Sequence, residues 1–272
     1  MLEKVNKFIA MLGTDGPAKA FQAGFMSIRA SIKHSNRETS ISAVQLGDGL
    51  KSTIVDGLDL PIPPDALMNS IGSPNRESYL GIAKVWGEML SGHLNDNSTV
   101  LDIGSGCARI ARSFVGLPQV KKYVGFDVIA ENVKWCKQFV EPASKGKMSF
   151  QHFDIFSAEY NPKGKIKSTN VRFPLENNEA DLVFAASVFT HLLERDCDHY
   201  LQETARVLKP KGGRAILSIH TSPQAGKSFS GNEARIDIAE EYFLKMAAKH
   251  DLKVHERMGM FHDQFLLVFS KI

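Results

Sequence analysis

The sequence has few cysteines, little net charge and no long hydrophobic run, and each absence excludes a class of protein. Its 272 residues include 3 cysteines, Cys107, Cys136 and Cys197, an odd number without CxxC spacing, which argues against a disulfide framework and a zinc cluster. The formal net charge of +3 is too small to hold the chain on nucleic acid or an anionic membrane by electrostatics alone. No apolar run approaches the ~20 residues that cross a bilayer. We therefore expect a cytoplasmic protein without a signal peptide or membrane insertion, whose partners are small molecules.

The length exceeds one average domain, and the surplus is expected at the N-terminus. Hydrophobic residues make up 43% and charged residues 23%, which are values typical of soluble globular proteins. Residues 1–72 are predicted to form a helical and irregular lid or arm. Within it, helical spacing covers 2–12 and 20–32, and the closely spaced Pro61, Pro63 and Pro64 of LPIPPDALMNSIG argue against regular structure. Residues 73–272 are predicted to form the main domain.

From Thr99 onward, apolar strands alternate with helices, which is the pattern of a parallel sheet covered on both faces. A helix over 73–90 with Ser73 as its N-cap is expected to lead into this sheet. The last two strands are separated by so few residues that they must be antiparallel neighbours. The predicted strands are 99–103, 121–127, 148–154, 180–187, 214–220, 252–258 and 264–270, and the predicted helices between them are 108–117, 129–140, 194–208 and 238–249.

The turn DIGSGCAR after the first strand lies where ligands bind in such a sheet. A dinucleotide site needs a third glycine where Arg109 stands, and Asp102 would place a carboxylate close to a pyrophosphate. The turn instead favours a ligand with a positive amino group, which the backbone of Gly104 and Gly106 can approach closely. Asp127 ends the second strand and can accept both hydroxyls of a ribose. The predicted ligand therefore has an amino acid end and a ribose.

Several strings together carry a family resemblance: VLDIGSGCARIA, YVGFD, HFDIF, SVFTHL and RVLKPKGGRAIL. Over about residues 73–272 the chain resembles the class I S-adenosylmethionine-dependent methyltransferases. The resemblance implies an α/β fold with a seven-stranded, Rossmann-like sheet of order 3-2-1-4-5-7-6, and S-adenosyl-L-methionine as cofactor. The sequence departs from the usual pattern of this family at two positions: Ala108 replaces a third glycine, and Lys211 is inserted in an exposed loop.

The resemblance also implies which residues contact the cofactor. Asp102, Gly104 and Gly106, with Ser105 between the glycines, would contact the methionyl part, and Asp127 would contact the ribose. The adenine would lie against Val128, Asp154 and Ile155, and the sulfonium would lie beside Ala186 and Ser187. Taken alone, Asp127 is also suited to cap a helix and Asp154 to cap a turn.

Two histidines at strand ends are candidate general bases, His191 after the fourth strand and His220 at the end of the fifth. Each also has a structural interpretation; His191, for example, is placed to order its loop or cap the next helix. Arg109 is expected to be a structural ion-pair partner. No acid cluster for metal-assisted methylation is evident, so no metal is predicted.

The strings FDIFSAEYNPKG, RFP, SVFTHL and ARVLKP further resemble bacterial methyltransferases that act on small molecules or sugars. The predicted function is O-methylation of such an acceptor, chosen by residues 1–72 and by the loop HTSPQAGKSFSGNEA. N-methylation of a small molecule and a non-catalytic module of the same fold are the alternatives. A methyltransferase acting on amino groups of nucleic acids would need the motif Asn/Asp-Pro-Pro-aromatic after the fourth strand, and a cytosine C5 methyltransferase would need Pro-Cys there. The sequence at that place is ASVFTH, which argues against both.

Overall fold

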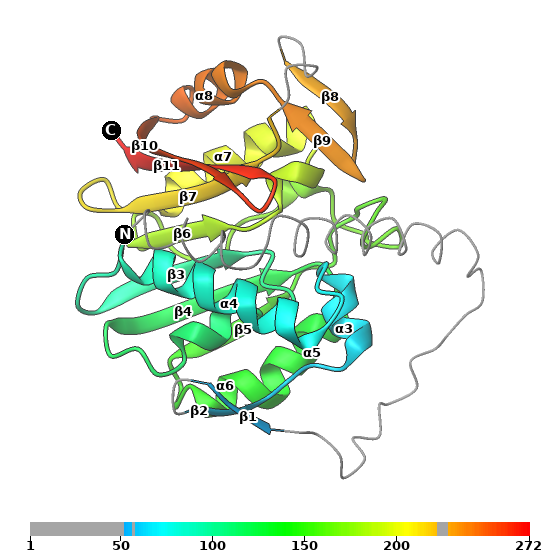
Figure 1. The fold of residues 1–272 in the computed structure, drawn as a ribbon. Coiled ribbons are helices and arrows are strands. Elements are labelled where there is room, and N and C mark those ends of the chain that lie inside the picture. Colours follow the sequence, from blue (N-terminus) through cyan, green and yellow to red (C-terminus); the bar gives the residue numbers. More distant parts are fainter. Residues whose placement is uncertain (1–51, 56–57, 222–227) are drawn as a thin grey trace.

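The structure, a computed structural model, describes residues 52–55, 58–221 and 228–272 (Figure 1). A seven-stranded sheet forms its centre. The strands of this sheet are β3 (Ser98–Ile103), β4 (Val120–Asp127), β5 (Met148–His152), β6 (Leu182–Ala185), β7 (Arg214–Ile219), β10 (Leu252–Phe261) and β11 (Gln264–Lys271). Their order is β10-β11-β7-β6-β3-β4-β5, with β11 antiparallel to both neighbours and the other pairs parallel. If the seven strands are numbered 1 to 7 in chain order and the sheet is read from β5 to β10, the order is 3-2-1-4-5-7-6. The predicted fold is therefore confirmed.

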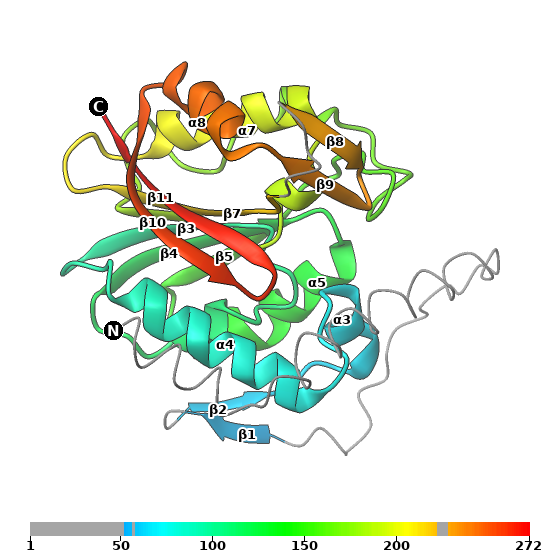
Figure 2. The same cartoon turned by 45° about the horizontal axis from the view of Figure 1, so that its top comes forward.

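Helices cover both faces of the sheet (Figures 1 and 2). The α-helices are α3 (Asp65–Ser70), α4 (Arg76–Ser91), α5 (Ala130–Trp135), α6 (Glu141–Ala143), α7 (Glu194–Val207) and α8 (Glu240–Ala248). One face carries α7 and α8, and the other carries α4, α5 and α6. Because successive strand residues point to opposite faces, Leu101 belongs to the apolar core on the first side and Val100 to the core on the second.

Two of the predicted helices differ from the structure at their N-terminal ends. The side chain of Asn75, not of Ser73, caps α4 by accepting a 2.8 Å hydrogen bond from the backbone N–H of Ser78. The predicted helix over 108–117 is wrong in kind, because the described backbone forms only the 3₁₀ turn η1 (Ala111–Phe114) there. Ala108, the first residue of the predicted range, has φ +63° in the left-handed region and so is not part of a right-handed helix.

The helix predicted over 129–140 begins at Ala130, after the extended Ile129, and is helical but irregular from there on. After α5 the chain continues through the π-helical turn η2 (Cys136–Val140) and then α6. The helix predicted over 238–249 starts later, as α8, because Ile238 is the last residue of a strand.

Two short antiparallel hairpins were not predicted. One pairs β1 (Ser52–Val55) with β2 (Leu58–Pro61), and the other pairs β8 (Phe229–Asn232) with β9 (Arg235–Ile238). The expectation of irregular structure around the prolines is wrong for β2 and α3. Pro61 ends a strand and Pro63 and Pro64 directly precede a helix, positions at which the missing N–H of proline does no harm.

The two helices expected over 2–12 and 20–32 lie outside the described residues. The segment over 60–71 packs against the main domain: Leu60 is buried, and its carbonyl accepts a 3.4 Å hydrogen bond from Nη2 of Arg112. The predicted division of the chain into an N-terminal lid or arm (1–72) and a main domain (73–272) stays a prediction. Among the helices described, none has the length and apolar character needed to span a membrane.

Candidate functional site

A cleft of about 620 Å³ lies at the carboxyl ends of β3, β4 and β6, where the order of the strands reverses. This is the size range and the position at which open α/β sheets bind small ligands. Most of the residues expected to contact the cofactor line it: Asp102, Gly104, Ser105, Gly106, Asp127, Val128, Ile155, Ala186 and Ser187. Asp154 is not among the lining residues. Its Oδ1 accepts a 3.2 Å hydrogen bond from Nδ2 of Asn161, so it holds the loop after β5.

The glycine turn admits no side chain at its two glycines. Gly104 has φ +74°, and a Cβ there would lie 2.5 Å from Cγ2 of Val188. Gly106 has φ +54°, and a Cβ there would lie 2.7 Å from Cγ2 of Ile71. Between them, Oγ of Ser105 is buried without a hydrogen-bond partner in the described part of the chain. A ligand in the cleft can therefore approach the backbone of this turn closely, and it can form a hydrogen bond with the unsatisfied hydroxyl of Ser105.

Asp102 is a buried carboxylate at the floor of the cleft. Its Oδ2 accepts a 2.6 Å hydrogen bond from the hydroxyl of Tyr123. Burial raises the pKa of Asp102 to about 7, and the nearby Asp127 adds to the rise, whereas Tyr123 and Arg109 oppose it. A positive group placed in the cleft would favour the ionised form of Asp102.

Asp127 is held by the backbone on both of its oxygens. Oδ2 accepts a 2.8 Å hydrogen bond from the N–H of Gly106, and Oδ1 accepts one of 2.8 Å from the N–H of Ile129. It thus orders the start of the α5 segment and the glycine turn together. Burial raises its pKa, and these two N–H groups oppose the rise. Each oxygen keeps a second lone pair with which it can accept a hydroxyl.

Arg109 serves the structure of the turn. Its Nη1 donates to the carbonyl of Ile71 at 3.0 Å and to Oγ of Ser73 at 2.8 Å. These bonds fasten the segment before α4 to the glycine turn. The partners are a carbonyl and a hydroxyl rather than the carboxylate of an ion pair.

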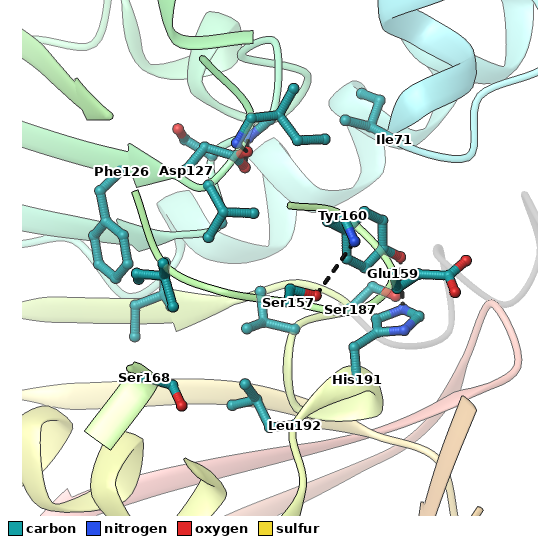
Figure 3. A pocket seen from close by; sticks show the side chains of 18 of the residues that line it. Ile71, Phe126, Asp127, Ser157, Glu159, Tyr160, Ser168, Ser187, His191 and Leu192 are labelled. Atoms are coloured by element: carbon teal, nitrogen blue, oxygen red, sulfur yellow. Dashed lines mark hydrogen bonds between the residues drawn. The ribbon is translucent and has the colours of Figure 1, made fainter. Parts of the chain in front are cut away.

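At the other end of the cleft, the side chains of His191 and Tyr160 meet (Figure 3), and the backbone carbonyl of Glu233 reaches His191 from a third loop. His191 ends the 3₁₀ turn η4 (Phe189–His191) after β6. Its Nε2 lies 3.0 Å from the hydroxyl of Tyr160, and its Nδ1 lies 2.8 Å from the carbonyl oxygen of Glu233. Burial lowers the pKa of His191 to about 4. The imidazole is therefore neutral at pH 7.

His220 does not line the cleft. It directly follows β7, and its Nδ1 lies 3.0 Å from the carbonyl oxygen of Asp263 in the β10–β11 turn. Burial and Arg235 lower its pKa. The two histidines proposed as bases are thus separated by the structure: His191 faces the cleft, and His220 joins β7 to the last hairpin.

Tyr160 and Glu233 are cleft residues that the sequence did not single out. Tyr160 lies in the segment EYNPKG, which is part of the family resemblance, and Glu233 lies in the loop HTSPQAGKSFSGNEA, which was predicted to choose the acceptor. Neither residue was predicted individually. The side-chain Oε2 of Glu233 accepts hydrogen bonds from Oγ of Ser157 at 3.1 Å and the N–H of Ala158 at 2.6 Å. The β8–β9 turn therefore holds both His191 and the loop that carries Tyr160.

Ser187 stands between the two ends of the cleft, beside Tyr160 and His191 (Figure 3). Its backbone has φ +63°, and its N–H donates to Oγ of Ser218 at 2.7 Å. Its own Oγ accepts a 2.8 Å hydrogen bond from Nε2 of Gln264. Within the described ranges, no group of three or more His, Cys, Asp or Glu side chains is placed to hold a metal ion.

Residues 101–216 match the model of a methyltransferase domain. Solved structures with the same fold include the 1,6-didemethyltoxoflavin-N1-methyltransferase of Burkholderia thailandensis, which is 14% identical with a TM-score of 0.55 over 79% of this chain and 93% of that one. The PH0226 protein of Pyrococcus horikoshii is 13% identical with a TM-score of 0.52 over 73% of this chain and 93% of that one. The [4+2]-cyclase SpnF is 15% identical with a TM-score of 0.52 over 71% and 81%.

Proposed function

We propose that this chain is a class I S-adenosylmethionine-dependent methyltransferase and that it methylates an oxygen atom of a small organic molecule. One observation carries the proposal. The cleft has two buried carboxylates beside a glycine turn at one end, and a neutral histidine hydrogen-bonded to a tyrosine at the other. The first end suits the cofactor, and the second suits an acceptor hydroxyl.

The residues of the first end fit S-adenosyl-L-methionine. Asp102 would face its ammonium group, and the turn from Gly104 to Gly106 would lie against the methionyl part, where Oγ of Ser105 is unsatisfied. Asp127 would accept the ribose hydroxyls, and Val128 and Ile155 would border the adenine. When bound, the cofactor supplies a methyl group already activated on a sulfonium.

The second end needs only to place and deprotonate the acceptor. Holding an acceptor in line with an activated methyl group supplies most of the acceleration, so no nucleophilic side chain is required. Ala186 and Ser187 separate the cofactor end from His191 and would border the sulfonium. Of the two candidate bases, only His191 is within reach of an acceptor in this cleft.

The walls of the cleft favour an acceptor with an apolar part. Phe156 and Leu193 both line the cleft and are 50% and 44% exposed, so the wall offers two large apolar side chains that a ligand can cover. A small molecule with an apolar body and a hydroxyl would cover them. A sugar remains the second acceptor class within the same proposal, since aromatic faces also pack against sugar rings.

N-methylation is the alternative that one observation favours. Glu159 lines the acceptor end and makes no ion pair within the described residues, and a carboxylate at that place would suit an amine. Mass spectrometry of the methylated product separates the two reactions. An ether product supports O-methylation and a methylamine product supports N-methylation.

Isothermal titration with S-adenosylmethionine and with its demethylated product, S-adenosylhomocysteine, tests the cofactor assignment. We expect both to bind, and we expect Asp127→Ala to weaken binding about tenfold or more, because it removes the ribose contacts and the hydrogen bond that holds the glycine turn at Gly106. Asp96→Ala, at an exposed carboxylate in the turn before β3, is the matched control and should bind as the wild type does. No heat with either compound would remove the methyltransferase proposal.

A further inference from the structure

The hydrogen bonds around His191 determine which of its ring nitrogens carries the proton. Nδ1 lies 2.8 Å from the carbonyl oxygen of Glu233, and a carbonyl can only accept. Nδ1 must therefore be the N–H donor. Because the imidazole is neutral at pH 7, Nε2 then carries a lone pair and no proton.

The protonation of His191 fixes the role of Tyr160. The hydroxyl of Tyr160 lies 3.0 Å from Nε2 of His191, and a bare Nε2 can only accept, so the phenol donates its single proton to the histidine. Burial raises the pKa of Tyr160 well above its usual value, which keeps the phenol protonated. With its proton committed to His191, the phenol oxygen has only lone pairs to offer the cleft.

The surrounding loops hold this arrangement from two sides. The Glu233 carboxylate accepts the hydroxyl of Ser157 and the N–H of Ala158, and Oγ of Ser157 in turn accepts a 3.3 Å hydrogen bond from the N–H of Tyr160 (Figure 3). The titratable groups near the pair are Glu159 on the Tyr160 loop, Glu233 on the β8–β9 turn and His220 at the end of β7. Lys167 and Arg195 also line the cleft, but the charges that shift the pKa of Tyr160 are those of Glu159 and Asp127, and both are negative.

We propose that Tyr160 selects an acceptor that enters the cleft with its proton in place, as an alcohol or an un-ionised phenol, and not as a phenolate, carboxylate or thiolate. An anion has no proton to donate to the phenol oxygen of Tyr160, and at that oxygen it would meet lone pairs and the negative charges of Glu159 and Asp127. This inference rests on the proposed O-methylation and narrows its substrate class. Tyr160 is the residue that touches the acceptor, and His191 is a positioning residue that acts through it.

The same hydrogen bonds give the acceptor proton a place to go. The acceptor oxygen forms its bond to the methyl carbon with its own electron pair, and the electron pair of the broken carbon–sulfur bond stays on sulfur. The acceptor proton passes to the oxygen of Tyr160 while the phenol proton of Tyr160 passes to Nε2 of His191. The positive charge lost from the sulfonium thus ends on the imidazolium. His191 is a weak base, but a hydroxyl oxygen that has gained a methyl group is a far stronger acid than an imidazolium.

The protonation of His191 can be measured without any acceptor. In ¹⁵N NMR spectra of the whole protein with S-adenosylhomocysteine bound, we expect the His191 ring to show a protonated Nδ1 and an unprotonated Nε2 at pH 7. His191→Asn, which removes one set of signals, assigns them. A protonated Nε2 would overturn the proposal, because Tyr160 would then accept from His191 and be free to donate to an anion.

Selection of a protonated acceptor has its own spectroscopic test. The probe is 4-nitrophenol, whose absorbance distinguishes phenol from phenolate, titrated into the S-adenosylhomocysteine complex across pH 6 to 9. We expect it to bind as the phenol, with its apparent pKa raised by about one unit or more. Tyr160→Phe should abolish the shift, and Tyr242→Phe, whose hydroxyl contacts Glu194 outside the cleft, should keep it.

The outcomes separate this inference from the proposed function. Binding of 4-nitrophenol as phenolate, absence of its binding, or an unchanged shift in Tyr160→Phe overturns the role of Tyr160 while binding of S-adenosylhomocysteine leaves the methyltransferase intact. Failure of S-adenosylhomocysteine itself to bind overturns the proposed function.

Discussion

Asp102 and Tyr123 lie on neighbouring strands with side chains on the same face of the sheet, and the Tyr123 hydroxyl donates to Oδ2 of Asp102 at 2.6 Å. This single donor is the only polar side-chain contact that the described residues give the Asp102 carboxylate. Burial consequently dominates, and the pKa of Asp102 rises from 3.8 to about 7. The carboxylate is destabilised until a positive ligand reaches it.

Asp102→Asn should stabilise the free protein at pH 8. The folded-state pKa lies above the unfolded-state value, so stability is retained below pH 4 and is lost as the pH rises toward 7, while the neutral amide avoids that loss. With about 1.4 kcal/mol per pKa unit, we expect a gain on the order of a few kcal/mol, seen as a higher Tm. Thermal unfolding of both proteins from pH 4 to pH 8 measures it. Asp96→Asn is the control, and parallel profiles for wild type and Asp102→Asn would contradict the prediction.

Cofactor affinity should fall as the pH drops below about 7, because a protonated Asp102 cannot attract the ammonium group. Each pH unit below the pKa should weaken binding by up to about tenfold. Titration calorimetry in two buffers of different ionisation enthalpy should reveal proton release on binding near pH 7.

Tyr123→Phe sharpens this test. It removes the donor that lowers the pKa of Asp102, so the midpoint of the affinity profile should move to higher pH. A profile flat from pH 6 to 8 in the wild type would show that Asp102 does not contact the positive group.

Gly104→Ala should abolish tight cofactor binding. The new Cβ would stand 2.5 Å from Cγ2 of Val188, in a backbone with φ +74°. Gly212→Ala is the matched control, because Gly212 has φ +79° and nothing within 4 Å. Both variants should lose about 1 kcal/mol of stability from the left-handed backbone, and only Gly104→Ala should lose about tenfold or more in affinity for S-adenosylhomocysteine. Equal affinities would mean that the turn does not cradle the ligand.

Glu233→Ala should loosen the Tyr160 loop while leaving the cofactor end unchanged. The backbone carbonyl that holds His191 is retained, but the N–H of Ala158 loses its 2.6 Å acceptor. We expect faster hydrogen exchange at Ala158, and binding of S-adenosylhomocysteine within about twofold of wild type. Glu233→Gln keeps an amide oxygen as acceptor and should restore slow exchange. Glu241→Ala, on an exposed turn of α8, should behave as wild type.

The end of the cleft beside the glycine turn was predictable because it is built from local features. Strand ends, the paired glycines and Asp127 sit at fixed distances along the chain, and the parallel sheet brings consecutive strand ends to one edge. Asp154 does not line the cleft, and its Oδ1 accepts a hydrogen bond from Asn161 in the following loop, so its contact with the adenine stays a prediction.

The sequence by itself determined the strands of the sheet and the carboxylates and glycines at their ends, because apolar periodicity and turn residues specify each strand and its end. The order of the strands was implied by the family resemblance. Only the tertiary structure decided the acceptor end. Tyr160 meets His191 across 31 residues, and Glu233 meets it across 42. Such contacts depend on how loops fold back over the sheet, and hydrogen bonds between loops leave no periodic signal in the sequence. For the same reason His191 and His220 look equivalent in the sequence, whereas the fold turns one into the cleft and the other toward the last hairpin.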